Sequence, residues 1–290
     1  ETSRHLVDAG GKRFRPLLTL LASHFGPRPA NDDVIKAAVV VELTHLATLY
    51  HDDVMDEAQL RRGAPSANAR WDNSVAILTG DFLFARASDI LADLGPEAVR
   101  IQAQTFERLC TGQIREAVGP DDGIDPVKHH LQVLSDKTGS LIAPAGRFGA
   151  MMAGAEASTI DTLSRFGEAI GVAFQLADDI VDITSDAEQS GKLPGTDLRE
   201  GVPTLATLIA QATDQSGDDA LVAFLSGPIP DDADHARALR LLREHPALED
   251  ARDEARRWAG DARRILEPLP AGDAKLALEA LCDYVVNRTG

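Results

Sequence analysis

Cysteine and basic residues are scarce in this chain. Only Cys110 and Cys282 occur among 290 residues, and they form no Cys-x-x-Cys pair. This excludes a disulfide framework and favours a reducing, cytoplasmic environment. Lysine and arginine total 29 against 46 aspartate and glutamate residues, which gives a net charge of −17. Such an excess of negative charge argues against nucleic acid as a general partner, although it leaves room for a local basic site.

Strand signals and long uncharged apolar runs are scarce as well. No apolar run reaches transmembrane length without a charge and no signal peptide is recognisable, so we expect no transmembrane segment. Helical signals, in contrast, recur from Pro16 to Arg288. With 44% hydrophobic residues the chain can bury a sizeable core. No linker stands out, and we expect one all-α domain over residues 1–290.

Capping and breaking residues predict where several helices begin and end. An apolar helix is expected from Pro16 to Gly26. A second helix, buried on all sides, is expected from Val34 to Tyr50 and beyond, after Asn31 or Asp32 as N-cap. Further helices are expected over about 72–95 and 96–118, and from about 126, 158 and 203. Loops are expected over residues 61–71, 119–126 and 185–201, and the last of these is a candidate lid.

The pattern Asp-Asp-x-x-Asp occurs three times, at residues 52–56, 121–125 and 178–182. Because aspartate makes up roughly a tenth of the chain, chance alone gives about 0.3 matches. The pattern alone is therefore weak evidence, and the sequence around each copy must show which copies are functional. The copy at 121–125 lies between Gly119-Pro120 and Pro126 and contains Gly123, which indicates a solvated turn. The other two copies follow long apolar helical runs.

These two copies place carboxylates at the C-terminal end of a helix, where mutual repulsion and the helix dipole oppose them. Asp52 and Asp56 lie one turn apart on one face, as do Asp178 and Asp182. Solvated carboxylates at a frayed helix end are one explanation. Burying them unpaired would cost several kcal/mol each. Mg²⁺ removes that penalty and is usually shared with substrate phosphates, so two such clusters facing each other across a bundle would bind a Mg²⁺–diphosphate.

Basic residues lie at both ends of the helix that leads into the first aspartate motif. Residues 10–16, GGKRFRP, precede it, and Arg61 and Arg62 follow it. Arginine suits bidentate phosphate contacts and lysine a point-charge contact. A surface charge explains any one of them, but their joint placement indicates a second anion site. His45, two turns before Asp52 on the same face, is either a core histidine or a donor to a phosphate.

Together these segments resemble the polyprenyl synthetase family of trans-isoprenyl diphosphate synthases. The resemblance covers roughly residues 4–290 and is carried, in order, by GGKRFRP, ELTHLATLYHDDVMD, RRGAPSANARW, NSVAILTGDFLFARA, SDKTGS, FQLADDIVD and GTDLREGVPT. It implies an isoprenoid synthase fold of about ten or more helices around a central cavity, and a homodimer. It also implies Mg²⁺-dependent, head-to-tail condensation of isopentenyl diphosphate with an allylic prenyl diphosphate, which gives a longer all-trans polyprenyl diphosphate.

The resemblance also assigns roles to individual residues. Three Mg²⁺ ions are implied with the bound diphosphate, and the matching residues are Asp52, Asp56 and Asp178, supported by Asp53 and Asp182. The contact to the allylic diphosphate is Arg61. The isopentenyl diphosphate site matches Lys12, Arg15, His45 and Arg62, and a further diphosphate contact matches Lys192. The residues beside the reacting carbons match Lys137, Thr138 and Gln175. Val202 stands where many members carry lysine, which removes one phosphate contact.

Small side chains follow the same helix back from the first motif. Ala47 and Thr48 occupy levels at which, in the family, bulky aromatic residues stop the growing chain, and Thr44, a further turn down, is small too. Because a packed interior tolerates little overpacking, their small size predicts a long product of roughly thirty carbons or more, with Phe106 as candidate floor. A short-chain farnesyl or geranylgeranyl diphosphate synthase is the alternative.

Two other classes of protein share parts of this pattern. Class I terpene cyclases also ionise allylic diphosphates, but they usually carry an Asn/Ser/Glu metal motif at the second position. Catalytically silent partner subunits of synthases typically lose an aspartate motif. Both aspartate motifs are intact here, which argues against either class.

Overall fold

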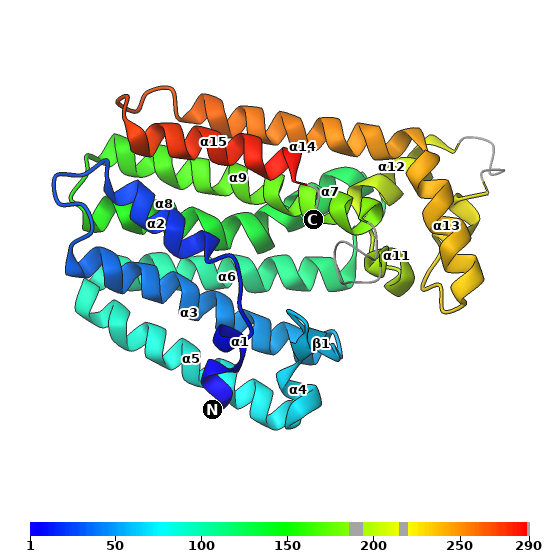
Figure 1. Cartoon of the computed structure of the whole chain (residues 1–290), viewed down its shortest axis with the longest axis horizontal. Coiled ribbons are helices and arrows are strands. Elements are labelled where there is room, and N and C mark those ends of the chain that lie inside the picture. Colours follow the sequence, from blue (N-terminus) through cyan, green and yellow to red (C-terminus); the bar gives the residue numbers. More distant parts are fainter. Residues whose placement is uncertain (186–193, 215–219, 289–290) are drawn as a thin grey trace. The chain divides into compact units, whose positions relative to one another are not determined.

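The chain folds mainly into helices (Figure 1). The computed structural model describes residues 1–185, 194–214 and 220–288. In this part of the chain the elements are η1 (Thr2–Arg4), α1 (His5–Asp8), α2 (Phe14–Ser23), α3 (Asp32–Met55), β1 (Leu60–Arg61), β2 (Ala64–Pro65), α4 (Ala67–Arg70), α5 (Asn73–Leu94), α6 (Pro96–Val118), α7 (Pro126–Leu134), η2 (Ser135–Gly139), α8 (Ser140–Met152), α9 (Ala157–Thr184), α11 (Thr196–Glu200), α12 (Leu205–Thr213), η3 (Val222–Phe224), α13 (Asp232–Glu244), α14 (Pro246–Ile265) and α15 (Asp273–Asn287). Element η2 is a π-helical turn. The predicted all-α fold is confirmed.

The helices group into two compact units. Unit 1 comprises Glu1–Glu107, Leu141–Gly167 and Pro268–Lys275. Unit 2 comprises Arg108–Ser140, Glu168–Glu267 and Leu276–Gly290. The single domain expected over residues 1–290 stays a prediction.

Helix α3 packs against α2 and α5 in unit 1. The side chain of Asn31 accepts hydrogen bonds from the backbone N–H groups of Asp33 and Val34, as its predicted role as N-cap requires. Buried side chains lie on several faces of α3, but Ile35 and Val39 are exposed, so the predicted burial on all sides is wrong for the first half of this helix. One core cluster of this unit consists of Leu6, Leu46, Ala47, Tyr50, Ala67, Ala76 and Leu83.

Gly80 sets the close spacing between α3 and α5. A Cβ at this position would lie 2.4 Å from Nε2 of His51 and 3.1 Å from the carbonyl oxygen of Ala47. A larger residue would therefore displace the His51 ring and crowd the backbone of α3. By length and hydropathy α3 could cross a membrane, but 56% of its most apolar stretch is buried inside the protein. That burial is typical of a core helix.

Unit 2 has its own apolar core, built from α7, α9, α11, α12, α13 and α14. Its buried members include Leu134, Val172, Leu176, Ile183, Leu198, Leu205, Leu242 and Leu248. Arg243 donates hydrogen bonds to the carbonyl oxygens of Ile183 (2.7 Å) and Ser185 (2.9 Å). These bonds satisfy carbonyl groups that have no partner within α9 itself.

Three predictions of element bounds were wrong. The segment 185–201, predicted as a loop and candidate lid, contains α11, and its residues 186–193 lie outside the described residues. Helix α2 begins at Phe14 rather than Pro16 and ends at Ser23, because a proline in the first turn lacks only an N–H group that the helix does not use. The segment 61–71, predicted as a loop, contains part of the β1–β2 hairpin and α4. The predictions for α5, α6 and α7 are confirmed.

Candidate active site

The first aspartate motif occupies the last turn of α3 and the residue after it. Asp53 is completely buried, and its Oδ1 atom accepts a hydrogen bond of 2.6 Å from Nε of Arg61. Burial raises the pKa of the Asp53 carboxyl group, and the Arg61 charge opposes that rise. Asp52 is partly buried and Asp56 is exposed. The motif therefore separates into a buried carboxylate that holds Arg61 and two carboxylates that solvent reaches.

Two arginines near this helix have left-handed backbone conformations, Arg13 with φ 50° and Arg62 with φ 55°. Nη1 of Arg13 pairs with Oε1 of Glu42 at 2.6 Å. Nη1 of Arg62 donates to the carbonyl oxygens of Leu6, at 2.7 Å, and of Gly10. A left-handed conformation costs about 1–3 kcal/mol in a residue other than glycine and persists where surrounding contacts hold it. These contacts thus fix the direction of both guanidinium groups.

His45 lies in the electrostatic field of four arginines. Burial lowers the pKa of His45 well below its usual value, and the charges of Arg15, Arg62, Arg61 and Arg13 lower it further. Burial also lowers the pKa of Arg15 to about 10. In the described part of the chain, Nε of Arg15 is buried without a hydrogen-bond partner. This concentration of positive charge and open donors suits an anion with several charges, such as a diphosphate.

A chain of hydrogen bonds links three polar side chains of unit 2. Oγ1 of Thr138 donates to Oε1 of Gln175 at 3.2 Å, and Nε2 of Gln175 donates to Oδ1 of Asp179 at 2.9 Å. Burial raises the pKa of Asp179 well above its usual value, and the nearby Asp197 raises it further. Asp179 therefore fixes the amide of Gln175 with its oxygen toward Thr138.

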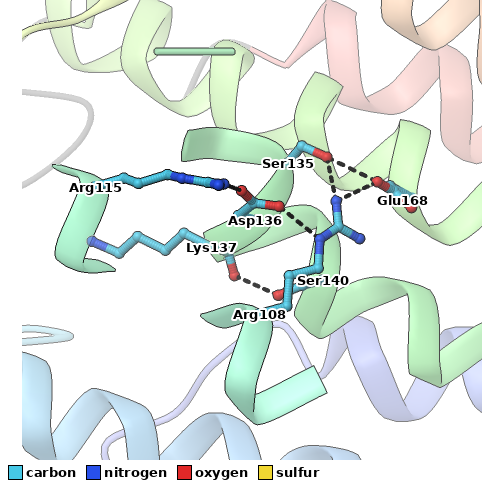
Figure 2. Close-up of polar contacts among 7 residues, drawn as sticks. All are labelled: Arg108, Arg115, Ser135, Asp136, Lys137, Ser140 and Glu168. Carbon is cyan, nitrogen blue, oxygen red and sulfur yellow. Dashed lines mark hydrogen bonds and ion pairs between the residues drawn. The ribbon is translucent and has the colours of Figure 1, made fainter. Parts of the chain in front are cut away.

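Lys137 and Thr138 lie in η2, and Figure 2 shows the polar contacts around this π-helical turn. The buried carboxylate of Asp136 is paired with Arg108 and Arg115. The carbonyl oxygen of Lys137 accepts a hydrogen bond of 3.4 Å from Oγ of Ser140. A π-helical turn inside a helical segment is rare and frequently marks a functional site.

The second aspartate motif ends α9. The side chain of Asp178 is 46% exposed, and its Oδ1 atom lies 2.8 Å from Nη2 of Arg288. The carboxylate of Asp182 accepts hydrogen bonds from the backbone N–H groups of Thr196 and Asp197, both at 3.2 Å. Asp182 thus holds the start of α11, and Asp178 has a half-exposed carboxylate.

The donor atoms of both motifs fit a hard divalent cation, because they are carboxylate oxygens. Among the described residues, no three His, Cys, Asp or Glu side chains are grouped closely enough to hold a metal by themselves. Mg²⁺ is usually bound by one or two carboxylates together with water and substrate phosphates.

The three small residues of the length prediction lie inside unit 1. Ala47, Thr48 and Thr44 are all buried. Oγ1 of Thr44 accepts a hydrogen bond of 2.9 Å from Nε2 of Gln102 on α6. One turn further along α6, the ring of Phe106 packs on Phe84, with 4.7 Å between ring centroids. The effect of these residues on product length stays a prediction.

Some residues of the predicted site do not belong to the arginine group around His45 or to the hydrogen-bonded chain of Thr138, Gln175 and Asp179. Lys12 is exposed, and Lys192 lies outside the described residues. Nζ of Lys137 is paired with Oε2 of Glu116 at 2.7 Å. Sequence reasoning did not single out Asp179 or Arg288. Asp179 stands inside the second motif, so the motif itself was a signal for it, whereas nothing in the sequence linked Arg288 to Asp178.

In this all-α protein, a helix ends in carboxylates and is flanked by arginines, and such an arrangement can hold a metal–diphosphate ligand. The sequence matches the Polyprenyl synthetase family over residues 1–242, and the chain belongs to this family. It is 54% identical over 288 residues to a nonaprenyl diphosphate synthase of Mycobacterium tuberculosis, with 99% of this chain and 85% of the relative covered.

Solved structures agree with this assignment. A geranylgeranyl pyrophosphate synthase from Corynebacterium glutamicum, complexed with calcium and isoprenyl diphosphate, is 51% identical with a TM-score of 0.86, covering 99% of this chain and 87% of that one. A decaprenyl diphosphate synthase from Rhodobacter capsulatus is 34% identical with a TM-score of 0.89, covering 100% and 89%. Relatives that make short and long products thus resemble this chain to a similar degree.

Proposed function

We propose that this prenyltransferase condenses isopentenyl diphosphate head-to-tail with an allylic prenyl diphosphate in a Mg²⁺-dependent reaction. The observation that carries the proposal is the set of arginines around His45, next to the carboxylates that end α3. An anion site beside carboxylates is what a metal-bound diphosphate and a second diphosphate require.

In this proposal the charged residues bind either the metal or one of the two diphosphates. Asp52, Asp56 and Asp178 bind Mg²⁺, which neutralises the charge that develops on the leaving diphosphate. Arg61, held by the buried Asp53, contacts the allylic diphosphate. The isopentenyl diphosphate is held by Lys12, Arg15, His45 and Arg62. Lys192 is a further diphosphate contact, and Asp182 supports the metal site.

Oxygen dipoles stabilise the allylic cation that forms when the C–O bond ionises. Thr138 and Gln175 present oxygens that are fixed by their mutual hydrogen bond, and Lys137 contributes its backbone carbonyl. Alignment of the isopentenyl double bond with the cation supplies the orientation part of catalysis. The proton released from the adduct goes to the departing diphosphate, because none of the side chains proposed to contact the substrates is suited to act as the base.

We propose a long-chain product of roughly thirty carbons or more, because Ala47, Thr48 and Thr44 leave no bulky side chain at the levels that would block the growing chain. The similarity to a nonaprenyl diphosphate synthase supports this length. The similarity to a geranylgeranyl pyrophosphate synthase favours a shorter product as the second candidate. A cytoplasmic homodimer is part of the proposal, and the free cysteines Cys110 and Cys282 agree with a reducing compartment.

The test is an assay of the purified protein with isopentenyl diphosphate and either farnesyl or geranylgeranyl diphosphate, with Mg²⁺ or with EDTA. Chromatography of the dephosphorylated products is expected to show Mg²⁺-dependent chains of roughly thirty carbons or more. Asp52→Asn should nearly abolish the reaction. Asp121→Asn, in the motif copy predicted as a solvated turn, is the matched control and should not change it. Products that stop at fifteen or twenty carbons with excess isopentenyl diphosphate would refute the length proposal, and absence of any condensation would refute the function.

A further inference from the structure

Arg288, the residue after α15, contacts the second aspartate motif. Its Nη2 atom lies 2.8 Å from Oδ1 of Asp178 and donates a hydrogen bond of 2.7 Å to the carbonyl oxygen of Phe174. The guanidinium carbon also lies 4.1 Å from the ring centroid of Phe174, which is a cation–π geometry. Arg288 is thus bound to two residues one turn apart on α9.

The burial of this arginine is unusual. The side chain of Arg288 is 3% exposed, whereas that of Asp178 is 46% exposed. In the described part of the chain, Nε and Nη1 of Arg288 are buried without hydrogen-bond partners. Arginine is almost never buried unless its charge is paired. The pairing with Asp178 is therefore what allows the guanidinium to stay in this position.

The contact with Arg288 also reduces the repulsion among the carboxylates of the second motif. Asp178, Asp179 and Asp182 end one helix, and the charges of Asp178, Asp182 and Asp197 act on the buried Asp179. Carboxylates gathered at a helix C-terminus repel each other and are opposed by the helix dipole. A guanidinium on Asp178 offsets part of this charge when no other cation is present.

We propose that Arg288 is a positioning residue for the second aspartate motif. In the metal-free protein its guanidinium serves as an internal cation on Asp178, and a divalent cation binds Asp178 only by displacing it. This inference rests on the proposed function, in which Asp178 is a metal ligand. It adds that Arg288 competes with the metal for the Asp178 carboxylate. The negative charge of the diphosphate is then needed to favour metal binding over the contact with Arg288.

A purely structural role for Arg288 would give the opposite result. If Arg288 only attached the end of α15 to α9, its loss would loosen the site and weaken metal binding or leave it unchanged. If Arg288 competes with the metal, its loss tightens metal binding. The sign of the change in affinity therefore separates the two roles.

The experiment measures binding of Mn²⁺ alone to the full chain by electron paramagnetic resonance, without substrate. Arg288→Gln should bind Mn²⁺ about tenfold more tightly than the unmodified protein, which is about 1.4 kcal/mol. Arg243→Gln is the matched control, because it removes a guanidinium that binds backbone carbonyls at the end of the same helix and that has no carboxylate partner among the residues that the structure describes. It should leave the affinity unchanged. Unchanged or weaker binding by folded Arg288→Gln would overturn the inference.

Two further measurements keep the test decisive. The effect of Arg288→Gln should vanish in an Asp178→Asn background. If Asp178→Asn itself binds Mn²⁺ like the unmodified protein, the metal role of Asp178 fails, and this inference fails with it. If Asp178→Asn weakens binding but Arg288→Gln does not tighten it, only the inference fails. Should Arg288→Gln not fold, hydrogen exchange of the unmodified protein decides. Mn²⁺ with inorganic diphosphate should speed exchange in the last turn of α15, and unchanged exchange would overturn the proposal.

Discussion

Arg108 holds the π-helical turn that carries Lys137 and Thr138, so its removal should destabilise unit 2. Its Nε atom pairs with Oδ1 of Asp136 at 2.7 Å. Its Nη2 atom donates to Oγ of Ser135 at 2.7 Å and pairs with Oε1 of Glu168 at 2.6 Å. Figure 2 shows these bonds converging on one guanidinium.

Arg115 offers a matched comparison, because it pairs with the same carboxylate but has no second carboxylate contact in this network. Arg108→Gln leaves Asp136, which is 4% exposed, with one arginine instead of two. It also removes the charged partner of Glu168. Arg108→Gln should cost about 2–3 kcal/mol, because it removes charged hydrogen bonds to a buried carboxylate. The cost is smaller than for a fully buried ion pair, because the Arg108 side chain is one-third exposed. Arg115 is more exposed, and Arg115→Gln should cost about 0.5–1 kcal/mol.

The effect should depend on pH. Burial alone would raise the pKa values of Asp136 and Glu168, but hydrogen bonds and positive charge, of which Arg108 supplies a large part to both groups, outweigh burial and leave both pKa values lowered. A carboxyl group with a lowered pKa in the folded state stabilises the protein fully above its unfolded pKa, which is about 4. That stabilisation is lost as the pH falls through the folded pKa. The difference between the unmodified protein and Arg108→Gln should therefore shrink below about pH 4.

Thermal unfolding followed by circular dichroism measures both effects. Each kcal/mol changes Tm by about 2–4 °C for chains of 150–250 residues, so Arg108→Gln should lower Tm by about 5–10 °C at pH 7, and Arg115→Gln by about 2 °C. Equal shifts for the two variants would contradict the central role of Arg108. A difference that persists undiminished at pH 3.5 would contradict the role of the two carboxylates.

Three further predictions concern the substrates. His45→Ala should raise the KM for isopentenyl diphosphate more than that for the allylic substrate, and Arg61→Ala should do the reverse; equal effects on both substrates in steady-state kinetics would remove this assignment. An anion bound beside His45 should raise its lowered pKa, so binding of isopentenyl diphosphate at about pH 6 should take up protons. Calorimetry in two buffers of different ionisation enthalpy detects this uptake, which should be absent in His45→Ala. Thr48→Phe should shorten the products while Thr48→Val does not, as judged by chromatography; an unchanged product from a folded Thr48→Phe variant would show that another part of the protein sets the length.

Local signals predicted the helix ends well. Asn31 and Asp72 accept hydrogen bonds from backbone N–H groups at the starts of α3 and α5, because capping depends on a few neighbouring residues. The start of α2 was missed for the converse reason. Arg13, at the N-cap position, makes no capping hydrogen bond, and its left-handed conformation is held by contacts to Val7 and Glu42. Contacts outside the helix decide such a start.

The π-helical turn at residues 135–139 had no signal in the sequence either. A Cβ at Gly112 of α6 would lie 2.9 Å from Cβ of Asp136 and 3.0 Å from the backbone nitrogen of Lys137. The turn therefore depends on a close approach from a helix more than twenty residues earlier. The link between Arg288 and Asp178 spans 110 residues, and periodicity carries no information at that distance.

The two aspartate motifs differ in how an arginine offsets the charge of their carboxylates. Each ends a helix with carboxylates that the helix dipole disfavours, and each pairs one of them with an arginine. In the first motif the paired carboxylate, Asp53, is completely buried and its arginine, Arg61, is 29% exposed. In the second motif the exposure is reversed, because Asp178 is 46% exposed and Arg288 is 3% exposed. In the proposed function, a metal would compete with Arg288 for the half-exposed Asp178, whereas Asp53 is buried. Arg61 would then keep Asp53 as its partner while its remaining donors contact a diphosphate, whereas Arg288 would give up Asp178 when a metal binds.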